Sequence, residues 1–281
     1  MDILSIIRVI LTLTADSSSK DDCKTCAPIK QFCSCKTDIN NRIYQVTCKT
    51  MPTSFKNVCL NFLQSMKFSD NTIRRLKGDP FNNMRVGHSN SVAFDFNSGI
   101  IEVVEPSLFK AVGNFAFELS FDSNRIKSFP SAKDLKFVSR ISLASNRLSH
   151  VPAFQLCEAP SLKYIDIHDN PAVREINAAP ASFKYCSKLR SVIWGVKSMN
   201  CQCSTLLQYF KHPHEFSGLP FYNTKGDPVV CSQSSFKAFR GMQSSKIDKR
   251  LVYSACDYSF ASKPMPSICL ILILSSFFAI V

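Results

Sequence analysis

A pattern of apolar residues on both sides of an asparagine recurs through the middle of the chain, and it constrains the fold more than any other feature of the sequence. One copy reads Ala116-x-x-Leu119-x-Phe121-x-x-Asn124-x-Ile126-x-x-Phe129. Successive asparagine or glycine positions lie 22 to 28 residues apart. Self-similarity at such a period predicts an array of stacked repeats. The equivalent positions of the other copies are Asn71, Gly99, Asn146 and Asn170, and a last partial copy begins at Leu189.

The spacing within a copy predicts its local structure. Apolar residues alternate with period two, so each copy contributes one short strand whose apolar side chains point inward. The asparagine can hydrogen-bond backbone groups of neighbouring coils that the bend would otherwise bury unpaired. A single coil cannot bury its own apolar face, so the coils must stack and be capped at both ends. These copies resemble leucine-rich repeats.

Cysteines flank the repeats on both sides. The chain reads Cys26-x6-Cys33-x-Cys35-x12-Cys48 before them and Cys201-x-Cys203-x27-Cys231-x24-Cys256 after them. Both spacings resemble the cysteine-rich caps of extracellular leucine-rich repeat proteins. The resemblance implies an α/β solenoid, a horseshoe with a short-stranded parallel sheet on its concave face and a disulfide cap at each end. It also implies the pairs Cys201–Cys231 and Cys203–Cys256.

The other cysteines leave several pairings open. The disulfide connectivity of the N-terminal cap does not follow from the sequence. Zinc binding is the alternative interpretation of Cys23-x2-Cys26 and Cys33-x-Cys35. The extra residues Cys23 and Cys59 can pair with each other, and a Cys157–Cys186 bond between adjacent coils is sterically reasonable. The chain has 13 cysteines, and loss of Cys269 with the C-terminal tail would leave an even number, which favours disulfides.

The two ends of the chain read as targeting signals. Residues 1–15 are mostly aliphatic and precede a polar run, which predicts a signal peptide cut near Ala15. Asp2 and Arg8 are atypical of such a signal, and a buried first helix or strand is the alternative.

At the other end, Ile268–Val281 is an uncharged stretch that as a helix would reach roughly 21 Å, short of a bilayer core of roughly 30 Å. With a proline-containing polar spacer before it, the tail resembles a glycosylphosphatidylinositol attachment signal. Asp257 and Ser259 are the candidate attachment residues. The alternatives are a short transmembrane anchor and simple secretion.

The repeat template also separates inward from outward side chains, because neighbouring strand residues point to opposite faces. The outward residues form the concave face, whose middle is acidic to neutral although the protein carries a formal net charge of +13. We expect a protein ligand or co-receptor with a neutral or basic surface to bind there, with Tyr164 as its aromatic anchor. A partner that uses a cap or the convex face is the alternative. The candidate contacts are Asp95, Glu118, Asp122, Arg140, Tyr164, Asp166 and His168.

Other function classes find little support in the sequence. A content of 45% apolar and 11% aromatic residues argues against a disordered chain. The chain has no hydrolase, zincin, P-loop or dinucleotide-binding motif, and no nucleophile can be placed beside His168 and Asp169. His212 and His214 could hold a metal, but a solvated loop is the favoured interpretation. The basic residues are scattered and no RNA-binding motif occurs, which argues against nucleic acid.

The expected organisation is therefore a signal peptide (1–15), an N-terminal cap (16–60), about six repeats (61–194), a C-terminal cap (195–257) and an anchor signal or membrane tail (258–281). We expect a non-enzymatic module without a cofactor or metal, lipid-anchored on the extracellular face of the plasma membrane. It would bind proteins as a receptor component, adhesion molecule or ligand trap. The alternative is a secreted matrix-type protein that binds acidic glycans through its basic surface.

Overall fold

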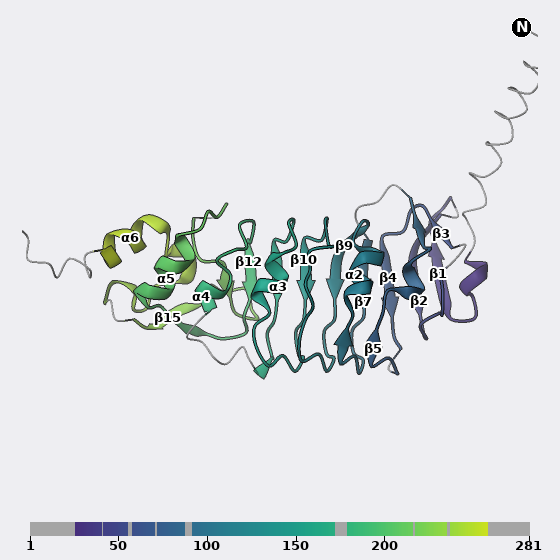
Figure 1. Ribbon diagram of the computed structural model, residues 1–281, viewed down its shortest axis with the longest axis horizontal. Helices are drawn as coiled ribbons and strands as arrows, with labels where there is room; N and C mark the ends of the chain where they lie inside the picture. Colours follow the sequence, from purple (N-terminus) through teal and green to yellow (C-terminus); the bar gives the residue numbers. More distant parts are fainter. Residues whose placement is uncertain are drawn as a thin grey trace, which may run out of the picture.

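The protein is an elongated mixed α/β molecule in which short strands lie side by side along the long axis (Figure 1). Its computed structural model describes residues 26–40, 42–55, 58–70, 72–87, 92–171, 179–215, 217–234 and 237–257. The expected signal peptide, Cys23, Asn71 and Ser259 lie outside the described residues, as does all of the tail at 258–281.

The dominant element is a nine-stranded sheet whose strands follow one another in chain order. All its neighbouring strands are parallel except the first pair, which is antiparallel. The sheet has two free edges and is not a closed barrel. Its strands are β1 (Cys33–Thr37), β2 (Ile43–Cys48), β4 (Ser65–Phe68), β7 (Val92–Asp95), β9 (Ala116–Ser120), β10 (Arg140–Ser142), β11 (Tyr164–Asp166), β12 (Ser191–Ile193) and β14 (Phe221–Tyr222).

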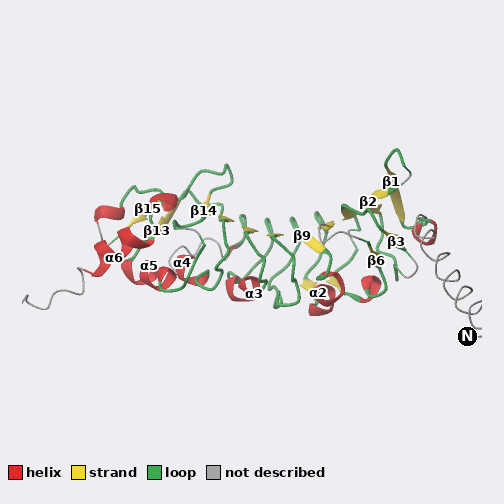
Figure 2. Ribbon diagram, turned by 90° about the horizontal axis from the view of Figure 1, so that it is seen from above, coloured by secondary structure: helices red, strands yellow, loops and turns green. Residues whose placement is uncertain are grey.

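Helices and smaller sheets form the rest of each coil, and Figure 2 shows α2, α3 and α4 on the opposite side of the molecule from the large sheet. The helices are α2 (Pro106–Val112), α3 (Ala153–Cys157), α4 (Ala179–Ser182), α5 (Cys203–Phe210) and α6 (Lys249–Asp257). Short 3-10 helices are η2 (Ala27–Ile29), η3 (Asp79–Phe81), η6 (Lys237–Phe239) and η7 (Ser244–Lys246). Three two-stranded sheets pair β3 (Cys59–Leu60) with β6 (Arg85–Val86), β5 (Arg75–Leu76) with β8 (Val103–Val104), and β13 (Ser198–Asn200) with β15 (Val230–Gln233).

The core lies between the sheet and the helical side. The inward residues of neighbouring strands are in register, so each lies beside the equivalent residue of the next coil. These inward residues are buried. Phenylalanine makes up much of this core: the rings of Phe68 and Phe96 stack with centroids 4.8 Å apart, and those of Phe96 and Phe121 with centroids 5.4 Å apart. Stacked rings in successive coils bury a large apolar area, which stabilises the coils against one another.

Buried asparagines complete the polar side of each coil. The Asn124 Oδ1 accepts the Ile101 N–H (3.0 Å), and its Nδ2 donates to the carbonyl of Phe96 in the preceding coil (2.8 Å) and to that of Phe121 in its own (3.0 Å). Asn146 and Asn170 repeat this arrangement one and two coils further on. The expected inward role of the asparagine is therefore confirmed for these three residues.

Gly99 occupies the asparagine position of its own coil, and close packing explains the residue. A Cβ built there would lie 2.8 Å from the Asn124 Oδ1, closer than van der Waals contact permits. A side chain at this position would therefore require the Asn124 amide to shift from its hydrogen bond with the Ile101 N–H.

Five disulfides join the described residues. They pair Cys26 with Cys35, Cys33 with Cys48, Cys157 with Cys186, Cys201 with Cys231, and Cys203 with Cys256. The last two are the pairs that the resemblance implied, and the Cys157–Cys186 bond links adjacent coils as the sequence suggested. Such a number of disulfides indicates an extracellular or secreted protein. In the part of the chain that the structure describes, no helix is both long enough and apolar enough to cross a membrane.

The sheet extends beyond the repeats at both ends, which the repeat template did not predict. Strands β1 and β2 add to one edge, and β14 pairs with β12 at the other, where the Val192 N–H donates to the Pro220 carbonyl (2.6 Å) and the Trp194 N–H to the Tyr222 carbonyl (2.8 Å). Without these strands, β4 and β12 would be edge strands with unpaired backbone groups. Strands β2 and β14 of the cysteine-rich segments pair with them.

Candidate functional site

The outward side of the large sheet, called the sheet face below, brings together the side chains that the sequence singled out. Because the strands are parallel and in register, residues equivalent in the repeat line up in rows across the sheet. One row contains Ser65, Ala93, Glu118, Arg140, Tyr164 and Ser191, and the next contains Lys67, Asp95, Ser120, Ser142, Asp166 and Ile193.

The first row centres on Arg140. Its Nε lies 3.8 Å from the Glu118 Oε1 on one side, and its Cζ lies 5.0 Å from the centroid of the Tyr164 ring on the other. The Arg140 side chain keeps half of its surface exposed and the Glu118 side chain about a third. A cation beside the face of an aromatic ring is a favourable contact that holds the ring in one orientation. Tyr164 is therefore presented as a fixed, half-buried aromatic surface.

The second row contains an ion pair at one end of the sheet face. The Lys67 Nζ lies 3.3 Å from the Asp95 Oδ2, and the other oxygen of Asp95 accepts the backbone N–H of Asn97 (3.0 Å). Both charged side chains remain partly exposed, so this pair is weak in water and open to exchange with groups of a partner.

Asp122 is hydrogen-bonded within the sheet face. Its Oδ1 accepts the Ser142 hydroxyl (2.5 Å) and the Ala144 N–H (2.9 Å), and its Oδ2 accepts the Ser120 hydroxyl (3.2 Å). These bonds join two successive coils through one carboxylate. Asp122 thus helps to hold the sheet face together.

Asp166 and His168 form a close pair at the far end of the sheet face. The His168 Nδ1 lies 2.6 Å from the Asp166 Oδ1, and its Nε2 lies 3.6 Å from an Asp169 oxygen. Burial raises the pKa of Asp166, and the Asp122 charge adds to this effect, whereas the hydrogen bonds and charge of His168 oppose it. The pair resembles the base half of a catalytic site, but carboxylate–histidine contacts of this kind also serve in structure and binding.

Two shallow hollows mark the sheet face. One of about 350 Å³ is lined by Glu118, Arg140, Tyr164 and Asp166 among others, and its neighbour of about 400 Å³ by Lys67, Asp95 and Asn97 among others. Both include Glu118 and Ser120, so they form one continuous polar depression.

From β4 to β12 the sheet face therefore offers charged groups, hydroxyls and the ring of Tyr164 to a partner. From β4 to β12 its charged strand residues, with Asp122, comprise four carboxylates and two cations, so this part of the sheet face is mildly acidic. In the described residues, no group of three or more histidine, cysteine or acidic side chains is placed to hold a metal ion.

The remaining sequence candidates lie elsewhere. Asp257 is the last residue of α6, next to Cys256, which is bonded to Cys203. His212 and His214 lie on the loop after α5, and each contacts an aromatic ring of Tyr185 or Tyr209. Asn97 was missed by the sequence analysis as a bonding residue: its Oδ1 accepts the Ser120 hydroxyl and the Asp122 N–H. Its outward position in the template was the available signal.

A scan of the sequence against models of known protein families finds no match, and a search of curated proteins finds none either.

Proposed function

We propose that the protein is an extracellular leucine-rich repeat protein with two disulfide caps, and that it is a non-enzymatic module that binds another protein through its sheet face. The repeat pattern of the sequence, the parallel strands in chain order and the buried asparagines support the solenoid interpretation. The polar depression along β4 to β11 supports the binding role, because it is built from rigid strands rather than from loops.

One observation carries the proposal: outward residues of five successive coils form a continuous, mildly acidic surface on a protein that is strongly basic overall. Complementary charge guides a partner to such a surface and fixes its orientation. The partner is expected to be neutral or basic where it touches this face, with an apolar contact for Tyr164.

Charge reversal tests the proposed site. In the triple variant D95K/E118K/D166K, partner binding should weaken at least about tenfold, since like charges would face each other across the interface. The readout is the binding of the full chain, displayed on cells, to a partner recovered by proximity labelling of the parent protein. The matched control reverses three acids outside the large sheet: Asp79, Glu102 and Asp134.

Equal binding by the parent and the sheet-face variant would refute the site, provided that both reach the cell surface in equal amounts. Weakening by the control variant instead would assign the partner to a surface outside the large sheet. The anchor at the C-terminal tail and the signal peptide belong to the same proposal and are tested separately.

A further inference from the structure

A second surface with the properties of a binding site lies away from the sheet face. Phe154 in α3 and Tyr185 after α4 are large apolar residues that are 62% and 52% exposed. Their rings meet edge to face with centroids 6.4 Å apart, and the Tyr185 ring contacts the His212 ring at 4.8 Å. Single exposed aromatics are common, but here two exposed rings and the half-buried ring of His212 touch in a row and form a ridge. We call these three residues the aromatic ridge.

The aromatic ridge is held in place by covalent and backbone links. The Cys157–Cys186 disulfide joins α3 to the residue that follows Tyr185. The Glu215 N–H donates to the Ser187 carbonyl (2.8 Å), which ties the loop of His212 to the same segment. A preorganised aromatic surface loses little entropy when a partner binds.

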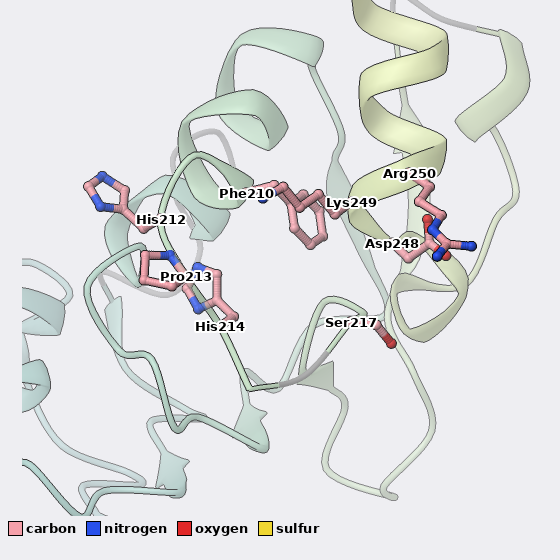
Figure 3. A pocket seen from close by; sticks show the side chains of 8 residues that line it. All are labelled: Phe210, His212, Pro213, His214, Ser217, Asp248, Lys249 and Arg250. Atoms are coloured by element: carbon pink, nitrogen blue, oxygen red, sulfur yellow. The ribbon is translucent and has the colours of Figure 1, made fainter.

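The aromatic ridge leads through His212 into a hollow of about 570 Å³ in the C-terminal segment. Pro213 and His214 line it on one side and the start of α6 on the other (Figure 3). The His214 ring lies flat against Tyr209, with centroids 4.0 Å apart, and its Nε2 lies 3.0 Å from the Tyr209 carbonyl oxygen. Burial lowers the pKa of His214, which favours the neutral ring. With buried Phe210, the hollow therefore has an apolar floor.

Cationic side chains flank both parts of this surface. The Lys184 Nζ lies 5.0 Å from the centroid of the Tyr185 ring, and exposed Lys249 and Arg250 line the hollow. The one carboxylate that lines it, Asp248, accepts the Leu251 N–H (2.8 Å) at the start of α6. Three cations and one carboxylate thus belong to this surface, and its net charge is positive.

We propose that the aromatic ridge and the hollow together form a second docking site, whose partner is an acidic protein segment that carries aromatic or aliphatic side chains. An apolar side chain of the segment fills the hollow, a second packs on the ridge, and its carboxylates face Lys184, Lys249 and Arg250. A sulfated glycan would be attracted by the cations, but it has no aromatic or aliphatic side chain to fill the hollow. This site is independent of the sheet face and of the anchor.

Model polymers test the proposal on the purified full-length protein, immobilised on a sensor surface. A random copolymer of glutamate and tyrosine should bind at least about tenfold more tightly than polyglutamate, because aromatic anchors supply much of the binding energy at such sites. Heparin should bind no more tightly than polyglutamate. Vesicles containing phosphatidylserine should also bind no more tightly than polyglutamate. Equal binding of the copolymer and polyglutamate would overturn the proposal, as would tighter binding of heparin or vesicles.

Paired variants locate the binding. The double variant F154S/Y185S should lose about tenfold in affinity for the copolymer, as should K184Q/K249Q/R250Q, which leaves the aromatic ridge intact. Copolymer affinity should not change in F117S/F137S, which removes two other exposed rings (43% and 40% exposed), nor in K110Q/K127Q/K136Q, which removes three other exposed cations. Loss in neither test variant, or equal loss in the controls, would overturn the site. All these side chains are exposed except that of Lys184, which is half-buried, and unchanged unfolding temperatures verify that the variants fold.

Discussion

At the scale of single residues, the buried asparagines explain how coils with so little regular secondary structure remain ordered. Each has an amide that satisfies one backbone N–H and several carbonyl groups in two successive coils. Buried backbone groups without partners are costly, and water cannot reach these positions because the side chains are buried. The residues that precede Asn124, Asn146 and Asn170 are Ser123, Ser145 and Asp169, and each adopts a strained positive φ between 53° and 57°. Ser98, which precedes Gly99 at the equivalent position, has a φ of 61°.

Replacement of Asn146 by alanine should destabilise the protein by about 3 kcal/mol, because the Ile126 N–H and up to three carbonyls lose their partner, and one unpaired buried group costs about 1–3 kcal/mol. Urea unfolding followed by circular dichroism measures the change. Asn82→Ala, at an exposed position, serves as the control and should change the free energy of unfolding by less than about 0.5 kcal/mol. Equal effects of the two substitutions would contradict the role of Asn146.

At the scale of elements, the repeats and the cysteine-rich segments form one continuous structure. The β12–β14 pairing covers an open edge, and the disulfide between Cys157 and Cys186 joins α3 to the segment after α4. The cross-link closes a loop with a sequence separation of 29 residues, which restricts the unfolded chain.

The double variant C157S/C186S should lose about 3–4 kcal/mol of stability, as expected from chain entropy for a loop of this length. Thermal unfolding without reductant measures the loss. Since the residues of the aromatic ridge flank this bond, the variant should also bind the glutamate–tyrosine copolymer more weakly. Unchanged stability would show that packing alone holds α3 against the next coil.

At the scale of the whole molecule, charge and cross-links define the environment in which the protein works. Five disulfides indicate an extracellular or secreted protein, and the formal net charge of +13 contrasts with the mildly acidic sheet face. Cations therefore lie mostly outside that face, some of them around the aromatic ridge. Two surfaces that prefer partners of opposite charge would allow two partners to bind at once.

Treatment of intact cells that express the full chain with a phosphatidylinositol-specific phospholipase should release the protein into the medium, because the proposed tail is exchanged for a lipid that the enzyme cleaves. Immunoblots of medium and cells measure the release. A control chain with residues 258–281 replaced by a spanning segment of about 20 apolar residues should stay on the cells. Protein in the medium without treatment would indicate a diffusible binder, and protein confined to the cell interior would contradict the signal peptide.

Much of the structure could be predicted from the sequence because the informative contacts are local and repeated. Period-two alternation indicated the strands and their inward residues, and the spacing to the bend indicated the role of Asn124, Asn146 and Asn170. The same template placed Glu118, Arg140, Tyr164 and Asp166 on one face, and the structure aligns them there in adjacent strands. The template could not show that the Asp122 carboxylate accepts hydrogen bonds from Ser142 and Ala144, because these bonds depend on distances between coils.

The sequence by itself determined where the repeat strands lie and which of their apolar side chains point inward, since both follow from local spacing. Only the tertiary structure decided the Cys26–Cys35 and Cys33–Cys48 pairs, the addition of β1, β2 and β14 to the sheet, and the contact of Phe154 with Tyr185. Loops on the helical side follow no repeating pattern. Their contacts arise when stacking brings residues from different coils together. Such contacts cannot be predicted from the spacing of residues along the chain.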